Sequence, residues 1–187
     1  MSVELLQAAS DRAASVLANI GPDDYAKSTP CVSWNVGDLV NHMVGAHNWF
    51  TGTLEAGTAP ADADADVTGG DIQAAYADAA KRSIAAFSEP GAMEKMLTLP
   101  FGQIPGGAFV MLAANDMFVH AWDLAKATGQ PTDVAPELAE QILGFAQMAI
   151  ADAIRGPEGK APFGPAVAAT DTASAPDRLA AFCGRTP

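Results

Sequence analysis

The stretch NDMFVHAWDLAKATG, residues 115–129, carries polar side chains on the apolar side of what its pattern predicts to be a core helix. Residues three and four apart lie one turn above each other on one face of a helix, so Asp116, His120 and Asp123 form a single column. The same face carries apolar side chains at Phe109, Leu112, Ala113, Leu124 and Ala127. The polar column is therefore predicted to point into the protein.

A different side of this helix, marked by Asn115 and Lys126, is expected to face water. The inward column then needs compensation, because removing one unpaired charge from water costs several kcal/mol, which is comparable with the stability of a whole domain. Three kinds of partner can supply it: a cation bound between helices, a basic side chain from another helix, or water that enters through a cleft.

Helical periodicity recurs in five blocks, at about 3–20, 35–56, 70–88, 106–128 and 135–154. No convincing strand run competes with these blocks, and the stretch IPGGAF is expected to be a turn before the fourth one. Gly21 and Pro22 are predicted to stop the first block, Ser33 to cap the second, and Gly129 with Pro131 to close the fourth. The pattern predicts an all-α fold, a four-helix bundle with an additional helix and a C-terminal tail.

The chain of 187 residues is long enough for one ordinary domain with a good core. We expect residues 1–155 to form the helical bundle. Residues 156–187 are expected to form a Pro/Gly-rich tail with one short helix that packs on the bundle, between Pro176 near its start and Gly184 after its end.

The charge balance is strongly acidic, with 22 Asp and Glu against 10 Lys and Arg and a net charge of −12. Such a surface repels phosphate, so we expect neither nucleic acid nor membrane as a partner. The first block reads as a helix and not as a signal peptide. Cys31 and Cys183 form no C-x-x-C pair, which fits a reducing cytoplasm. We expect a cytoplasmic monomer or homodimer that acts on a small molecule.

The chain has three histidines, His42, His47 and His120. His42 and His47 are five residues apart and diverge by roughly 140° around the second helix, so both cannot face one point. Each flanks the apolar stripe of that helix, and periodicity leaves the choice between them open.

If His42 faces His120 and Asp116, two imidazoles and one carboxylate converge. That set is a competent site for Zn²⁺, Ni²⁺ or Fe²⁺, and three protein ligands leave an open coordination position. Asp123 would then fix the tautomer of His120, or contact a bound ligand. The alternative is an ordinary ion pair within one helix, although such a pair would normally face water.

Other chemical motifs are absent from the sequence: there is no G-x-S-x-G elbow, no phosphate-binding P-loop and no dinucleotide fingerprint. Trp34, Trp49 and Trp122 are expected to be core or the wall of a pocket. Cys31 could lie near the site as a thiol, but a buried cysteine before a helix is more often a packing residue.

Three stretches carry a resemblance to a known family: TPCVSWNVGDLVNHMVGAHNWF, LPFGQIPGGAFVMLAANDMFVHAWDLAKATGQP and FGPAVAATDTASAPDRLAAFCGRTP. They resemble the actinobacterial branch of the DinB-like superfamily. More narrowly, they are similar to the metal-binding domain of mycothiol-dependent maleylpyruvate isomerase and its shorter relatives. The resemblance covers nearly the whole chain.

The resemblance implies a DinB-like four-helix bundle whose metal is held by His42, Asp116 and His120, and it selects His42 over His47. The isomerase has Glu at the position of Asp116, so this chain is one methylene shorter there. The isomerase also has a further C-terminal domain that contributes a substrate-binding arginine. This chain has instead a short tail with Arg155, Arg178 and Arg185, so the resemblance does not extend to maleylpyruvate as the substrate.

The first hypothesis is an enzyme in which a divalent metal, zinc before nickel or iron, binds a low-molecular-weight thiol such as mycothiol. A thiol on a metal is deprotonated well below its free pKa of about 8.5, which favours S-transfer to a small electrophile or its isomerisation. The alternative is a non-catalytic metal-binding or ligand-sensing bundle. An iron oxygenase is a third possibility, but its two-histidine, one-carboxylate site is usually built on a β-scaffold.

Overall fold

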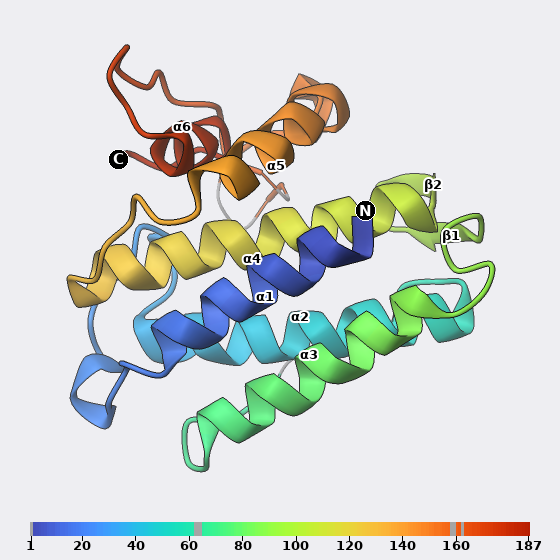
Figure 1. Cartoon of the computed structure of the whole chain (residues 1–187), viewed down its shortest axis with the longest axis horizontal. Coiled ribbons are helices and arrows are strands. Elements are labelled where there is room, and N and C mark those ends of the chain that lie inside the picture. Colours follow the sequence, from blue (N-terminus) through green and yellow to red (C-terminus); the bar gives the residue numbers. More distant parts are fainter. Residues whose placement is uncertain (1, 62–64, 158–159, 162) are drawn as a thin grey trace.

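Four long helices form the body of the protein in the computed structural model, which describes residues 2–61, 65–157, 160–161 and 163–187. They are α1 (Ser2–Leu17), α2 (Val36–Ala56), α3 (Ile72–Ser88) and α4 (Gly106–Thr128). Helix α1 packs on α3 and α4, and α2 packs on the same two helices, which closes a bundle (Figure 1). The predicted all-α, DinB-like bundle is confirmed.

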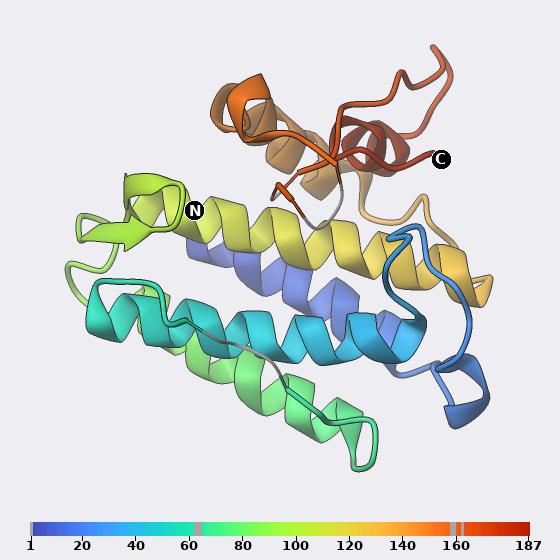
Figure 2. The same cartoon turned by 180° about the vertical axis from the view of Figure 1, so that it is seen from behind.

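A second layer covers the outer side of α4. Helices α5 (Pro136–Ala149) and α6 (Ala175–Phe182) pack against each other and against α4 (Figure 2). Helix α4 is therefore enclosed, with the bundle on one side and the α5–α6 layer on the other. This arrangement overturns the expectation that Asn115 faces water, because its side chain is only 3% exposed, whereas Lys126 is exposed as expected.

Most helix ends agree with the sequence signals, with small corrections. Gly129 ends α4 in the left-handed conformation, at φ 71°, as predicted. The cap of α2 is Asn35 and not Ser33: the Asn35 side chain accepts a hydrogen bond from the Asp38 amide, and the Asp38 carboxylate accepts one from the Asn35 amide.

Two helices are shorter than the periodicity predicted. Helix α1 ends at Leu17 and not at about residue 20. Helix α5 ends at Ala149, and the rest of its predicted block, to about residue 154, contains a separate 3₁₀ turn at Asp152–Ile154 (η2).

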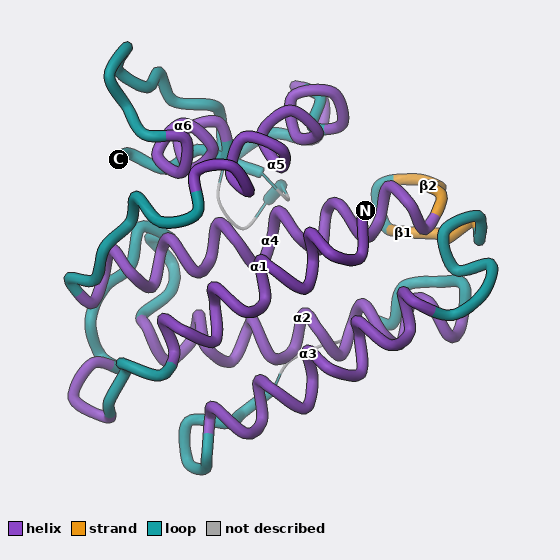
Figure 3. Tube along the Cα trace, in the orientation of Figure 1, coloured by secondary structure: helices purple, strands orange, loops and turns teal. Residues whose placement is uncertain are grey.

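A small hairpin, which the sequence pattern did not predict, precedes α4. Strands β1 (Met96–Leu99) and β2 (Gly102–Pro105) pair in antiparallel fashion, from Met96 opposite Pro105 to Leu99 opposite Gly102 (Figure 3). Leu97 and Leu99 are buried, whereas Met96 and Thr98 are exposed. The stretch expected to be a turn therefore ends a strand and begins a helix, and four residues are too few for the alternation to be recognised in the sequence.

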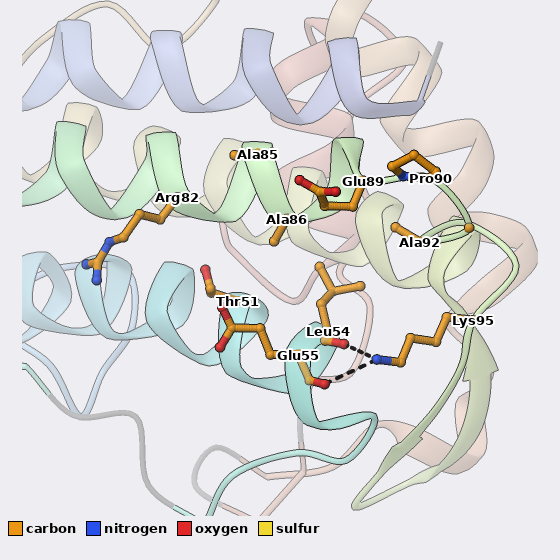
Figure 4. Close-up of a pocket in the computed structure, with 11 residues that line it drawn as sticks. Thr51, Leu54, Glu55, Arg82, Ala85, Ala86, Glu89, Pro90, Ala92 and Lys95 are labelled. Atoms are coloured by element: carbon orange, nitrogen blue, oxygen red, sulfur yellow. Dashed lines mark hydrogen bonds between the residues drawn. The ribbon is translucent and has the colours of Figure 1, made fainter.

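The segment between α3 and the hairpin is attached to the end of α2. Lys95 donates from its Nζ to the main-chain carbonyl oxygens of Leu54 and Glu55 in the last turn of α2 (Figure 4). A cation at that position also complements the negative end of the helix dipole. Within the described parts of the chain, none of the helices has the length and apolarity that crossing a membrane requires.

Gly106 is expected to be irreplaceable because the main chain of the preceding loop lies against it. A Cβ atom there would lie 1.9 Å from the carbonyl oxygen of Ala92, whereas one at Gly107 would lie 3.5 Å from that of Met93. We therefore expect Gly106→Ala to lower the free energy of unfolding by at least about 2 kcal/mol. Gly107→Ala, the matched control, should change it by less than about 1 kcal/mol. Urea unfolding of both variants tests this, and equal effects would contradict the close approach.

Candidate metal centre

His42, Asp116 and His120 meet where α2 crosses α4. His42 Nε2 lies 3.7 Å from Asp116 Oδ2, and His120 Nε2 lies 3.4 Å from Asp116 Oδ1. One candidate ligand atom of each residue lies within 4.8 Å of those of the other two. The two imidazole rings are held edge to face, with their centroids 4.9 Å apart. The structure thus brings together the three residues that the sequence singled out.

The Trp34 ring, from the loop before α2, covers the two imidazoles. Its centroid lies 4.5 Å from that of His42 and 5.9 Å from that of His120. An aromatic ring on these histidines restricts their rotation, so their Nε2 atoms stay directed toward Asp116. Trp34 is the pocket wall that one of the sequence interpretations expected.

The Asp116 carboxylate has one oxygen that fits a bound cation. Oδ2 is buried and has no hydrogen-bond partner among the described residues, although the side chain as a whole is 30% exposed. An unsatisfied buried carboxylate oxygen is costly, and coordination by a metal satisfies it. Two imidazole nitrogens and one carboxylate oxygen are also a common donor set for zinc. The residues present therefore fit a divalent metal.

Electrostatics couple Asp116 and His120 into an ion pair. Burial raises the pKa of Asp116, but the facing imidazoles of His120 and His42 lower it by more. The net result is a pKa well below the ordinary 3.8. Burial lowers the pKa of His120, but the charge and hydrogen bond of Asp116 and the hydrogen bond to Asp123 raise it well above 6.5. In the protein alone, His120 is therefore protonated, and a metal would replace that proton.

Asp123 lies behind His120. Its Oδ2 is 3.0 Å from His120 Nδ1, and its side chain is fully buried. With Nδ1–H donated to Asp123, Nε2 is directed toward Asp116: it carries a proton in the protein alone and would offer its lone pair to a metal. A carboxylate in this position fixes both the tautomer and the ring orientation of a ligating histidine.

Arg185, from the end of the chain, neutralises Asp123. Its Nε donates to both Asp123 oxygens at 3.2 Å and its Nη2 donates to Oδ2 at 2.9 Å. Burial raises the pKa of Asp123, but the hydrogen bond from His120 and the charge of Arg185 lower it below its ordinary value. Asp123 is thus compensated by a basic side chain, one of the three kinds of partner foreseen, although that side chain comes from the tail and not from a helix.

Cys31 is part of this cluster and not a mere packing residue. Its Sγ lies 3.1 Å from Arg185 Nη2, 3.3 Å from Asp123 Oδ2 and 4.0 Å from His120 Nδ1. Cys31, His120 and Asp123 are therefore a second group with metal-ligand geometry. The guanidinium of Arg185 already occupies this second group, so the cluster with His42 is the better candidate for a metal.

His47 is directed away from the candidate centre, into the core between α2 and α3. Its Nδ1 lies 2.7 Å from Ser83 Oγ and its Nε2 lies 3.3 Å from Tyr76 OH. Burial lowers the pKa of His47 to about 4, so the imidazole is neutral near pH 7. His47 is a hydrogen-bonded core residue.

Two clefts meet at the candidate centre. The polar cleft, of about 580 Å³, is lined by Cys31, Trp34, His120 and Arg185 among others, and opens between the tail and the loop before α2. The apolar cleft, of about 330 Å³, runs between α2 and α4. The two share His42, Asn115, Asp116 and Phe163 in their walls. A molecule in either cleft can therefore reach the same carboxylate and imidazole.

Sequence reasoning missed the roles of Arg185 and Asn115. The sequence indicated that the buried column needs a cation, and a basic side chain was one of the candidates. No feature of the sequence, however, distinguishes Arg185 from the other two arginines of the tail. Asn115 was expected at the surface, but it lies in the walls of both clefts and accepts a long hydrogen bond from Cys183, with Sγ 3.6 Å from its Oδ1.

Comparisons with known proteins agree with this architecture. Residues 6–125 match a family model described as the mycothiol maleylpyruvate isomerase N-terminal domain. Two uncharacterized proteins of Mycobacterium tuberculosis, from strains CDC 1551 / Oshkosh and ATCC 25618 / H37Rv, are each 39% identical over 184 residues, covering 96% of this chain and 95% of theirs.

A crystal structure of the mycothiol-dependent maleylpyruvate isomerase superposes with a TM-score of 0.61 at 12% identity, over 76% of this chain and 66% of that one. The family match includes both clusters of candidate ligands and ends before α5, so Arg185 lies outside it.

Proposed function

The chain belongs to the mycothiol maleylpyruvate isomerase N-terminal domain family, and from that premise we propose that it is a metal- and thiol-dependent enzyme. His42, Asp116 and His120 hold a divalent ion, zinc before nickel or iron, and a thiol of the mycothiol type reacts there with a small electrophile by S-transfer or isomerisation. The observation that carries the proposal is the Asp116 carboxylate, which lies between two imidazoles at the junction of two clefts and has one buried oxygen, Oδ2, without a hydrogen bond among the described residues.

The metal supplies one effect, since a thiol that coordinates it loses its proton well below the free pKa of about 8.5. The other contributions come from the chain. His42, Asp116 and His120 would hold the ion as its three protein ligands. Asp123 accepts a hydrogen bond from Nδ1–H of His120 and keeps Nε2 directed to the centre, and Trp34 packs against both imidazoles.

The name of the solved isomerase does not identify the substrate of this chain. At 12% identity that structure supports the fold alone, and this chain spans 66% of its length. Both cysteines are free, which supports the proposal of a reducing, cytoplasmic location.

Calorimetric titration of the zinc-loaded protein with mycothiol tests the proposed function. We expect binding that needs zinc, is abolished by a chelator and releases a proton, so that the measured heat depends on the ionisation enthalpy of the buffer. Electrophile consumption should then require zinc and thiol together. Zinc binding without binding of any small thiol would contradict the proposal and favour a non-catalytic metal-binding or ligand-sensing bundle.

A further inference from the structure

The apolar cleft has a wall of aromatic and aliphatic side chains that extends in one direction from the candidate centre. On α2, Trp49 and Phe50 follow His42 by about two turns, and on α4, Leu112 and Phe109 precede Asp116 by one and two turns. Since α2 and α4 run in opposite directions here, both rows of side chains extend toward the hairpin, where Phe101 completes the wall.

The rings of this wall present hydrocarbon to the cleft. Phe109 contacts Trp49 and Phe50 at centroid distances of 5.5 and 5.6 Å, in steep edge-to-face arrangements. The one polar atom of these rings, Trp49 Nε1, donates to the Pro60 carbonyl oxygen at 3.2 Å and is therefore satisfied within the protein. A ligand in this cleft would therefore gain binding free energy from apolar contacts and from contacts with the aromatic rings.

The charges around both clefts disfavour an anionic ligand. No lysine or arginine is among the described residues that line the apolar cleft, and Asp116 stands at its inner end. Arg185 is the one lysine or arginine among the described lining residues of the polar cleft. Its three nitrogens are already used, by Asp123, Cys31 and the Cys183 carbonyl oxygen. Apart from the proposed metal and the imidazoles that hold it, the described walls therefore offer the carboxylate of a ligand no lysine or arginine without a partner.

We propose that the apolar cleft binds an uncharged aromatic group, and that this group is the recognised part of the electrophile, while the thiol occupies the polar cleft. The identification of the ligand as a substrate rests on the proposed function, but the binding of such a group does not. The substrate class is then a neutral aryl compound and not a small dicarboxylate.

Two fluorescent probes with the same ring skeleton separate these possibilities: the uncharged N-phenylnaphthylamine and its anionic relative anilinonaphthalene sulfonate. Titrations use the full chain without thiol, once zinc-loaded and once with a chelator. We expect N-phenylnaphthylamine to saturate at one per chain, with energy transfer from tryptophan, and to bind at least about tenfold more tightly than the sulfonate. Saturating mycothiol should leave N-phenylnaphthylamine bound to the zinc form.

Three variants locate the probe. Leu112→Asp places a charge in the cleft and should weaken N-phenylnaphthylamine at least about tenfold. Phe101→Ser removes part of the wall at a side chain that is already 42% exposed, so it should weaken the probe without threatening the fold. Met148→Asp is the matched control, because Met148 is a helical residue 82% exposed on α5, and it should leave affinity unchanged.

Absence of saturable binding, tighter binding of the sulfonate, or equal binding to Phe101→Ser and Met148→Asp would overturn the inference. The mycothiol titration of the same preparations keeps the two proposals apart. Thiol binding without probe binding refutes the apolar-group assignment alone, whereas probe binding without thiol binding refutes the thiol-dependent function and leaves the cleft assigned.

Discussion

Replacement of Arg185 by methionine is expected to lower the free energy of unfolding by about 3–5 kcal/mol, because it leaves the Asp123 carboxylate buried without its cation. The Asp123 side chain is fully buried, and that of Arg185 is 16% exposed. His120 cannot replace the guanidinium, because its single charge is shared between Asp116 and Asp123. Methionine retains the apolar part of the arginine side chain, so the change reports mainly on charge. Urea unfolding in excess chelator measures it without a contribution from metal binding.

The same substitution at Arg178 is the matched control. Arg178 pairs with Glu140 at the surface, where the side chains are 42% and 54% exposed, and such pairs contribute at most about 1 kcal/mol. The double variant D123N/R185M should recover at least about half of the loss of R185M, because the amide oxygen can still accept a hydrogen bond from His120 and position 123 no longer carries a buried charge without a cation. Equal losses at Arg185 and Arg178 would show that the buried pair is worth no more than a surface pair.

Asp116→Ala is expected to lower zinc affinity by more than about 100-fold. Removing a side chain that only orients a metal ligand already lowers metal affinity by roughly 10- to 100-fold. Asp116 is proposed to contribute a ligand atom itself, so its loss should lower the affinity by more. Competition against a chromophoric chelator measures the affinity, with circular dichroism to establish that the variant is folded.

His47→Gln is the control for that experiment, since His47 lies in the core and hydrogen-bonds to Ser83 and Tyr76. Its zinc affinity should match that of the unmodified protein. A comparable loss in Asp116→Ala and His47→Gln, with both variants folded, would mean that the ligands have been assigned to the wrong residues.

The helices could be predicted where local signals and periodicity agree. The fourth block, predicted at about 106–128, coincides with α4, because its apolar face is continuous and the sequence places Gly129 and Pro131 directly after it. The cap of α2 was misplaced because Ser33 and Asn35 are both good capping residues. The path of the preceding loop decides between them: the Val36 amide donates to the Lys27 carbonyl, and Ser28 forms a bridge with Asn35.

The column of Asp116, His120 and Asp123 could be predicted because one helix determines it. Its surroundings could not, because they depend on how the tail packs. The three tail arginines are equivalent in sequence, but Arg155 donates to the Gly164 and Phe182 carbonyl oxygens, Arg178 pairs with Glu140, and Arg185 reaches Asp123. Likewise, the burial of Asn115 follows from the α5–α6 layer, which no pattern within α4 reveals.

A crystal structure of the zinc-soaked protein, with anomalous data collected on both sides of the zinc edge, tests the central claim most directly. The account predicts one strong anomalous peak, at about 2.0–2.2 Å from His42 Nε2, His120 Nε2 and an Asp116 oxygen. Such a peak would lie where the polar and apolar clefts meet. A peak among Cys31, His120 Nδ1 and Asp123 with Arg185 displaced, or no peak at His42 despite stoichiometric zinc in solution, would contradict it.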